Sequence, residues 1–508
     1  GSSRFPAADQ WAFFPSFSAG YRFTEDAYFK NLKIDNVLSN GKIRASYGHI
    51  GNEAIGTDMF LPTVANETSY WLNGAGQMQA MSSTPRLVYS SLTWERVITT
   101  DVGVDLGFFN NSLNLTFDWF QRDTKDMLAP GNTLPGVLGA SAPMMNKGHL
   151  RTRGWELGIS WNHSFGDADV YANFSIYDGK TTVVEYNNPT MPINGFYDGA
   201  VYGDIWGFEY DRYFEESDFA GKDDNGKWIY KDGIADQTGL QSGSFVYGPG
   251  DIKFKDLDGD GVISGGNKNM IELNGQTFIP GQAGYEAALA NPDHKTVAVG
   301  SAKNHGDLKV IGNATPRYEY SFRIGGAWKG FDIDLYFQGV GKRSYWTTSA
   351  FVMPFTRGAD ATYANMNSYN TMDFDGYEIV GYHIDQSNKY PCMYDGAANA
   401  GTVSNLAQGR YNFYPQDRYL MNMAYLRFKN LTVGYTLPIE LTKKAYIQKA
   451  RIYFSCDNPC LLYNGMKDYP IDPEIGSQWK TTSSYSNGSF GRTDPMMRTY
   501  SFGMQVTF

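Results

Sequence analysis

From Thr499 to Phe508, the end of the sequence, apolar side chains alternate with polar or small ones without a break. The segment 498–508 is therefore predicted to be a β-strand, in which every second residue lies on the same face. Its apolar face carries Tyr500, Phe502, Met504, Val506 and Phe508. Soluble antiparallel strands also alternate, but the ends of soluble domains usually fray in polar residues. A final strand that ends on an aromatic side chain favours an apolar environment along one whole face of the sheet.

Ten more segments alternate with the same period, which predicts an all-β fold of eleven antiparallel strands. A short helical connection is expected within 25–38. The apolar phase slips by one residue at Asn430, which predicts a β-bulge there. The other expected strands span 13–23, 41–51, 95–108, 112–126, 154–165, 169–186, 317–328, 331–342, 424–435 and 451–462.

The connections between these strands alternate between tight and long. Tight turns are expected at Asn110-Asn111, Gly166-Asp167 and Lys329-Gly330, where Asn and Gly accept the positive φ of hairpin turns. The two largest connections span 187–316 and 343–423. Outer-membrane barrels sort their connections in this way, with short periplasmic turns and long extracellular loops. The sequence therefore predicts a transmembrane antiparallel β-barrel with extracellular loops at 187–316 and 343–423, rather than a secreted soluble β-protein.

The composition is compatible with a barrel. Aromatic residues make up 16% of the 508 residues, which suits the two aromatic girdles of a membrane barrel. No apolar run is long enough for a membrane helix, and a barrel needs none because only every second residue faces lipid. The net charge of −10 argues against nucleic acid as the main partner. Asp118, Arg122, Arg317 and Arg323 are expected to line the interior, and Phe117, Trp119, Tyr318 and Phe322 to face lipid.

Eleven strands do not close a bacterial single-chain barrel, which has an even number of strands. An open sheet would leave two unpaired edges in hydrocarbon, where unsatisfied backbone groups are costly. No signal-peptide pattern opens the sequence either. We therefore expect residues 1–508 to form the carboxy-terminal half of a barrel of about 22 strands, the number found in plugged transporters. The remaining half would be another chain or another portion of the same gene product.

Sequence motifs occur along the whole chain in a characteristic order. They are Gly1-Ser-Ser-Arg-Phe-Pro6, Asp101-Val-Gly-Val-Asp-Leu-Gly107, Gly154-Trp-Glu156, Gly250-Asp-Ile-Lys-Phe-Lys-Asp-Leu-Asp-Gly-Asp-Gly261, Ile311-Gly-Asn-Ala-Thr-Pro-Arg317, Tyr425-Leu-Arg-Phe-Lys-Asn-Leu-Thr-Val-Gly-Tyr435 and Asp457-Asn-Pro459. In these motifs the chain resembles the SusC/RagA family of TonB-dependent outer-membrane transporters.

The resemblance implies import of a large nutrient, a glycan or a peptide, across the outer membrane of Bacteroidetes, powered by TonB. It also implies a SusD-like surface lipoprotein as partner, and it assigns the TonB box and the plug to the missing amino-terminal half. A surface adhesin, or a ligand-binding barrel without transport, is the alternative, because long loops suit both. An enzyme is not expected, since no two histidines have metal-ligand spacing and neither a Gly-x-Ser-x-Gly elbow nor a phosphate-binding loop occurs.

One ligand motif lies in the first large loop. Asp256, Asp258 and Asp260 have the spacing of the carboxylates in a calcium loop, and Val262 would supply a carbonyl. The twelfth position holds Asn267 instead of a bidentate Glu, which lowers the expected affinity. The alternative is an Asp- and Gly-rich turn capped by its own side chains. A structural calcium is therefore a possible ligand, and no cofactor is expected to be required.

The second large loop is rich in tyrosine. Its candidates for substrate binding are Tyr363, Tyr369, Tyr377 and Tyr382, because sugar rings stack on aromatic faces. Packing of an ordered loop, or contact with a protein partner, is the alternative, since Tyr is enriched at interfaces. An odd number of cysteines excludes a framework in which every cysteine is in a disulfide. Whether the last two cysteines form a disulfide with each other is not decided by the sequence. The three are Cys392, Cys456 and Cys460.

Overall fold

We describe the protein from a computed structural model with all side chains. The chain divides into two compact units, which are treated separately. Unit 1 comprises 1–163, 171–189 and 196–202, and unit 2 comprises 164–170, 190–195 and 203–508. No helix in the described part of the chain is long and apolar enough to cross a membrane. The structure describes residues 1–57, 59–83, 85–131, 134–241, 245–346, 368–375, 378–392, 412–469, 471–476 and 496–508.

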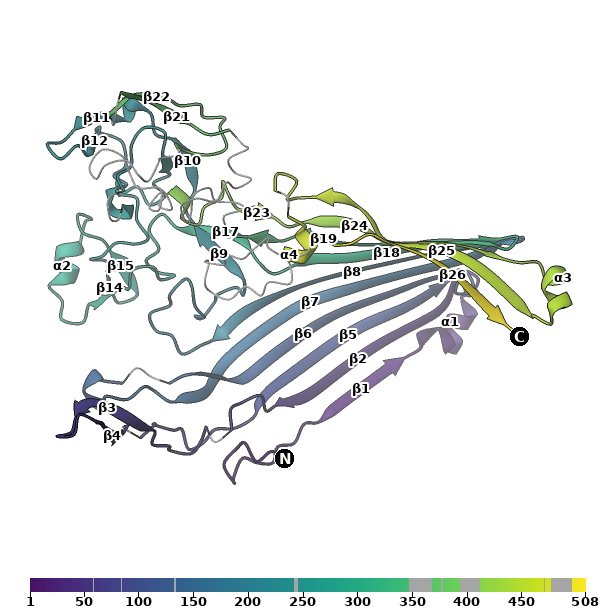
Figure 1. Cartoon of the computed structure of the whole chain (residues 1–508). Helices are drawn as coiled ribbons and strands as arrows, with labels where there is room; N and C mark the ends of the chain where they lie inside the picture. Colours follow the sequence, from purple (N-terminus) through teal and green to yellow (C-terminus); the bar gives the residue numbers. More distant parts are fainter. Residues whose placement is uncertain are drawn as a thin grey trace. The chain divides into compact units, whose positions relative to one another are not determined.

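Unit 1 is built from long antiparallel strands that lie side by side in chain order (Figure 1). The helical link predicted between the first two strands is present as the 3₁₀ turn η1 and helix α1. The strands are β1 (Ser16–Tyr21), β2 (Leu38–Asn52), β5 (Glu95–Phe108), β6 (Leu113–Pro130), β7 (Met144–Phe165) and β8 (Ala168–Glu185). Their connections hold η1 (Phe23–Glu25), α1 (Ala27–Asn31), β3 (Asn66–Leu72), β4 (Met78–Ser82) and η2 (Gly136–Leu138).

Unit 2 contributes the other long strands. They are β18 (Arg317–Trp328), β19 (Phe331–Lys342), β24 (Tyr425–Thr436), β25 (Lys449–Asn464) and β26 (Thr499–Thr507), with α3 (Ile439–Thr442), η7 (Lys443–Ala445) and α4 (Pro473–Gly476) in their connections. These strands pair antiparallel with their neighbours in chain order. The predicted all-β fold with eleven long strands is therefore confirmed.

The sequence predicts loops in the connections 52–94 and 127–153, and both predictions are wrong in part. The connection 52–94 contains the β3–β4 hairpin, and residues 144–153, expected in a loop, begin strand β7. These residues pair with the end of β6, for example Asn146 with Leu128. The alternation is hidden there because polar side chains such as His149 and Arg151 occupy the face that is apolar further along the strand.

Cross-strand rows of residues confirm the predicted faces of the sheet, because residues opposite one another in register share a face. Val104, Phe117 and Leu157 form one apolar row across β5, β6 and β7. The next row, on the other face, is polar and contains Asp118. The guanidinium of Arg44 lies 2.6 Å from an oxygen of Asp118 and 3.0 Å from one of Asp105. In unit 2, Arg323 pairs likewise with Asp334 at 2.7 Å.

The predicted bulge is present in β24. Tyr336 of β19 opposes Asn430, whereas the next residue, Phe337, opposes Phe428. Lys429 is therefore the extra residue, and the inserted position returns apolar side chains to one face. The rings of Phe337 and Phe428 stack there with centroids 4.6 Å apart.

The predicted tight turns have the backbone that their residues favour. Lys329 and Gly330 join β18 to β19 with φ of 47° and 87°, and Asn110 and Asn111 have φ of 56° and 62°. In each unit the short links and the large insertions lie at opposite ends of the long strands (Figure 1). In unit 1, α1 lies at one end and the β3–β4 hairpin at the other; in unit 2, α3 lies opposite the elements of the two large loops.

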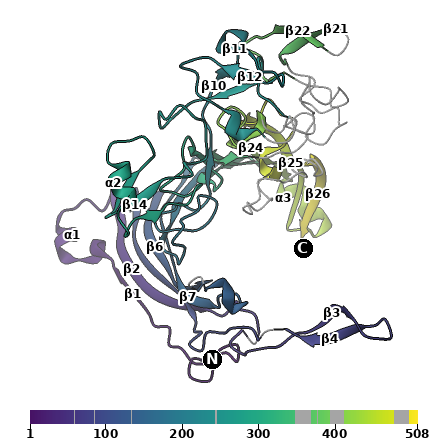
Figure 2. The same cartoon turned by 90° about the vertical axis from the view of Figure 1, so that its left-hand side faces the viewer.

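The large insertions of unit 2 are folded. A single apolar cluster draws on all three of its long connections, with Phe254 from the first, Tyr419 from the second and Met466 from the third. Figure 2 shows β10, β11 and β12 gathered with β21 and β22 from the second loop. The strands are β9 (Asp204–Gly207), β10 (Tyr210–Tyr213), β11 (Phe219–Lys222), β12 (Trp228–Tyr230), β13 (Ile252–Phe254), β14 (Ile271–Leu273), β15 (Gln276–Phe278), β16 (Lys295–Thr296), β17 (Lys309–Asn313), β20 (Ser344–Tyr345), β21 (Thr371–Asp375), β22 (Glu378–His383) and β23 (Met421–Asn422), with α2 (Tyr285–Leu289), η3 (Glu216–Asp218) and η4 (Thr238–Leu240).

Candidate ligand and cation site in the large loops

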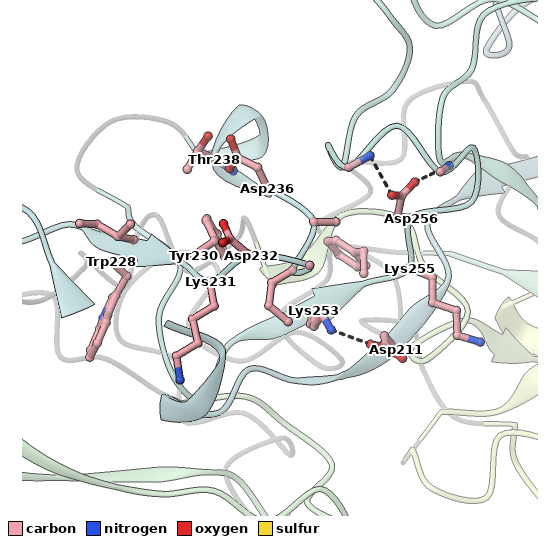
Figure 3. Close-up of a pocket in the computed structure, with 17 residues that line it drawn as sticks. Asp211, Trp228, Tyr230, Lys231, Asp232, Asp236, Thr238, Lys253, Lys255 and Asp256 are labelled. Atoms are coloured by element: carbon pink, nitrogen blue, oxygen red, sulfur yellow. Dashed lines mark hydrogen bonds and ion pairs between the residues drawn. The ribbon is translucent and has the colours of Figure 1, made fainter. Parts of the chain in front are cut away.

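A cavity of about 870 Å³ with mixed polar and apolar lining lies in the first large loop of unit 2 (Figure 3). One wall is β12 with the turn that follows it, and the other is the end of β13 with the aspartate-rich loop. The turn supplies Lys231, Asp232 and Asp236, and the aspartate-rich loop supplies Asp256. The lining therefore combines charged residues of both signs with apolar ones such as Ile234 and Phe254.

Ion pairs hold the floor of this cavity. Lys253 Nζ lies 3.2 Å from Asp211 Oδ2, and Lys255 Nζ lies 2.5 Å from Glu209 Oε1. The cavity also has an aromatic side, because Trp228 lines it, with the ammonium of Lys222 4.8 Å from the centre of its ring. Charged groups that are already paired favour a ligand bound by several hydrogen bonds over one bound by a single charge.

The aspartate-rich loop has the geometry of a cation site. One oxygen each from Asp256, Asp258 and Asp260 lie within 4.8 Å of one another. Oxygens that bind one calcium at 2.3–2.6 Å are at most about 5.2 Å apart, so these three carboxylates fit the ion. Exposed acidic groups of this kind also occur without a metal.

The same carboxylates cap the turn, as the alternative interpretation predicted. Asp256 accepts hydrogen bonds from the backbone N–H of Gly259 (2.7 Å) and Gly261 (2.9 Å), and Asp260 accepts one from the N–H of Val262 (2.8 Å). Asn267, at the twelfth position, accepts a bond from the N–H of Asn269 (3.0 Å), so its side chain caps its own turn. The capping bonds and a bound ion are compatible, because each carboxylate has two oxygens with several acceptor positions.

Asp307 stabilises the aspartate-rich loop through hydrogen bonds, and the sequence did not identify this residue. Its carboxylate is fully buried and accepts bonds from the backbone N–H of Leu257 (2.7 Å) and Ser264 (2.8 Å), near the two ends of the loop. Burial, with a smaller contribution from the charges of Asp258 and Asp256, raises its pKa to about 6. Asp307 lies far from the motif in sequence, so no local spacing identifies it.

The candidate tyrosines of the second loop do not form a common binding surface in the described residues. Tyr363 and Tyr377 lie outside those residues. Tyr369 is part of an isolated bridge with Tyr390, which is fully buried. Tyr382 packs in the cluster of Cys392, with its ring 6.2 Å from that of Trp228. Burial raises the pKa of its phenol. These contacts favour the packing interpretation for Tyr382, whereas the side chain of Tyr369 is 42% exposed.

The three cysteines are free thiols. Cys456 opposes Leu431 and Cys460 opposes Phe428 across β24 and β25. The disulfide that the sequence left open between these two cysteines is therefore not formed.

Known proteins share this architecture. Residues 1–247 match the family model described as "TonB dependent receptor-like, beta-barrel". TonB-dependent receptor P3 of Formosa agariphila is 25% identical over the whole chain and 43% of its own length. TonB-dependent receptor SusC of Bacteroides thetaiotaomicron is 26% identical over 71% of the chain and 38% of its own length. Our chain thus spans less than half the length of the relatives it matches.

The fold of the whole chain also matches a solved structure. The RagAB peptide transporter aligns over 100% of our chain and 44% of its own, with a TM-score of 0.60 and 18% identity. The same protein solved as the RagAB peptide importer in a "closed-closed" state gives a TM-score of 0.59 at 19% identity. At these identities the match establishes the fold alone.

Proposed function

We propose that this chain takes part in active import of a large nutrient across a bacterial outer membrane. The proposal is supported by the match of residues 1–247 to the TonB-dependent receptor β-barrel family and by the similarity to SusC. The nutrient would be a glycan, as an oligosaccharide, or a peptide. TonB would supply the energy through the part of the receptor that this chain does not cover, and a SusD-like surface lipoprotein would be the partner.

One observation supports import over passive diffusion. The described residues of the three long connections of unit 2 share one apolar core, and the first connection contains the cavity, so they form a folded body at one end of the strands. A diffusion pore gains little from such a body, whereas capture of a large ligand needs it. A surface adhesin would use it equally well, and dependence on TonB separates these two functions.

The membrane placement is part of the proposal. The apolar rows of the sheet would face lipid, and the ends with large insertions would face the exterior. Among the described strands, β1 pairs only with β2, and β26 only with β25. Unpaired edges are not stable in hydrocarbon, so further strands would pair with both.

The decisive experiment measures uptake of a labelled polymer by cells of the native species. In cells with TonB, we expect uptake of the polymer and co-purification of a lipoprotein with the receptor. When tonB is deleted, uptake should be lost while the lipoprotein still co-purifies. Undiminished uptake without TonB would contradict active import, and binding without any uptake in either strain would favour the adhesin.

A pair of matched variants tests the cavity. Replacing Lys231 and Asp232 by Ala removes one charge of each sign from its wall. Replacing Lys227 and Asp224 removes the same charges from the exposed turn of the same hairpin, outside the cavity. We expect the first variant alone to lower uptake. Deletion of 343–423 is unsuitable, since that loop contributes Tyr419 and other residues to the common core.

We also infer that the aspartate-rich loop binds a structural calcium. The proposal rests on the three oxygens within 4.8 Å of one another and on the spacing of the motif. Replacing Asp256, Asp258 and Asp260 by Asn should remove bound calcium in elemental analysis while uptake persists. Stoichiometric metal retained by the triple variant would refute the assignment.

A further inference from the structure

Several basic side chains of unit 1 lie on the face of the sheet that carries the apolar rows. They are next to a pair of tryptophans. Trp119 and Trp155 oppose one another across β6 and β7. In the following pairs along the strands, Gln121 opposes Arg153 and Asp123 opposes Arg151. Each of these positions is an even number of residues from Trp119 or Trp155. The side chains therefore share the face that carries the apolar rows.

The two arginines are held from the side by neighbours on β6. Arg153 is exposed and donates through Nε to Gln121 Oε1 at 2.8 Å. Arg151 donates through Nε to Asp123 Oδ1 at 2.7 Å, and Asp123 also pairs with His149 at 2.7 Å. These bonds position both guanidinium groups and do not use their terminal nitrogens. Arginines held in this way are suited to bidentate contact with a phosphate.

Two more cations extend the cluster. Arg96 of β5 opposes Lys125 of β6, on the same face, and Arg96 pairs with Asp126 at 2.5 Å. We call Arg96, Lys125, Arg151 and Arg153 the basic row. The basic row contributes four positive charges, and the carboxylates of Asp123 and Asp126 beside it contribute two negative charges. The cluster of these six side chains therefore has a net positive charge.

The surroundings of the basic row indicate the kind of ligand. Beyond the tryptophans, toward the tight turn at Asn110-Asn111, the same face is apolar, with rows such as Val104, Phe117 and Leu157. In the other direction it leads to the long connection after β6. A ligand that covers both parts must be apolar over most of its length and anionic at one end.

We propose that the basic row binds the phosphorylated headgroup of an outer-leaflet amphiphile, whose acyl chains lie over the apolar rows. The inference rests on the proposed membrane placement, with the long connections outside. Tryptophan rings at the lipid–water boundary fix the depth. Arg153 then lies about 7 Å beyond this level along the strand, Arg151 about 13 Å, and Arg96 and Lys125 about 20 Å, so the basic row extends through the headgroup region.

The test uses the complete receptor, purified with all its strands from its own outer membrane. After removal of lipid in detergent, binding of bisphosphorylated lipid A is measured by native mass spectrometry. Arg153→Gln is compared with Arg122→Gln, which removes the same charge from the opposite face of β6. We expect Arg153→Gln to weaken binding about fivefold, from the usual contribution of one basic side chain near an anionic surface. Arg122→Gln should bind like the wild type.

Other ligands distinguish the possible sources of the phosphate. Dephosphorylated lipid A should bind less, and inorganic phosphate should compete only weakly. Equal binding of lipid A by wild type and Arg153→Gln, or displacement by inorganic phosphate at the same concentration as the lipid, would overturn the proposal. Membrane fractionation tests the placement separately: a receptor that reaches the outer membrane but does not discriminate among these lipids contradicts only the headgroup site.

Discussion

We expect Arg427 of β24 to raise the free energy of local opening of the segment that follows β25 in unit 2. The residue is only 4% exposed and its guanidinium pairs with Asp472 and, from Nε to Oε2 at 2.8 Å, with Glu474. Met466 and Ile471, in the same segment, belong to the common core of the large loops. Replacing Arg427 by Met removes the cation and leaves two carboxylates without it at a largely buried site.

The magnitude follows from burial. Breaking a buried pair by removing one partner costs about 3–5 kcal/mol. The carboxylate side chains are 20% and 16% exposed, so the lower end of this range applies. A loss of about 3 kcal/mol in the free energy of local opening corresponds to amide exchange on the order of 100-fold faster.

Hydrogen exchange measured by mass spectrometry checks this value. The readout is the set of peptides from 465–469 and 471–476, where the N–H of Gly465 bonds to Ala424 O and that of Glu474 to Asp472 Oδ1. Lys429→Met is the comparison, because Lys429 pairs with the same Glu474 at 2.6 Å but its side chain is 20% exposed, against 5% for Arg427. It should change exchange by less than about tenfold. Unchanged exchange in Arg427→Met, or equal acceleration in both variants, would refute the argument from burial.

Three further predictions concern other parts of the chain. Burial raises the pKa of Asp307 to about 6, above the value near 3.9 of an unfolded chain, so its ionisation opposes folding. The metal-free loop should therefore lose up to about 3 kcal/mol as pH rises from 4 to above 6, visible as faster exchange at pH 7 than at pH 5 after correction for the intrinsic rate. Gly330→Val should reduce the folded, membrane-inserted fraction in a heat-modifiability gel, because φ there is 87° and a Cβ would lie 2.8 Å from Thr436 O. Phe117→Arg, on the apolar face, should cost about 2–4 kcal/mol of barrel stability in urea titration, whereas Thr116→Arg, on the polar face, should cost much less.

The sequence by itself determined the long strands of this protein. Strand period and turn chemistry are local properties, so alternation gave β5, β18 and β19 their observed bounds, and Lys329-Gly330 identified a hairpin from two residues. The phase of the apolar residues predicted the bulge at Asn430, one residue from its observed position at Lys429, because one face of the sheet must stay apolar. The start of β7 was missed since its side chains are polar where the strand extends past the apolar rows.

Only the tertiary structure determined which residues of the loops and strands contact one another. Asp307 reaches the aspartate-rich loop, and the ring of Tyr382 meets that of Trp228, only after chain segments distant in sequence have packed together. Arg153 joins Gln121 because strand register places them opposite one another. Such contacts depend on the path of the whole chain rather than on residue spacing, so no periodicity in the sequence encodes them.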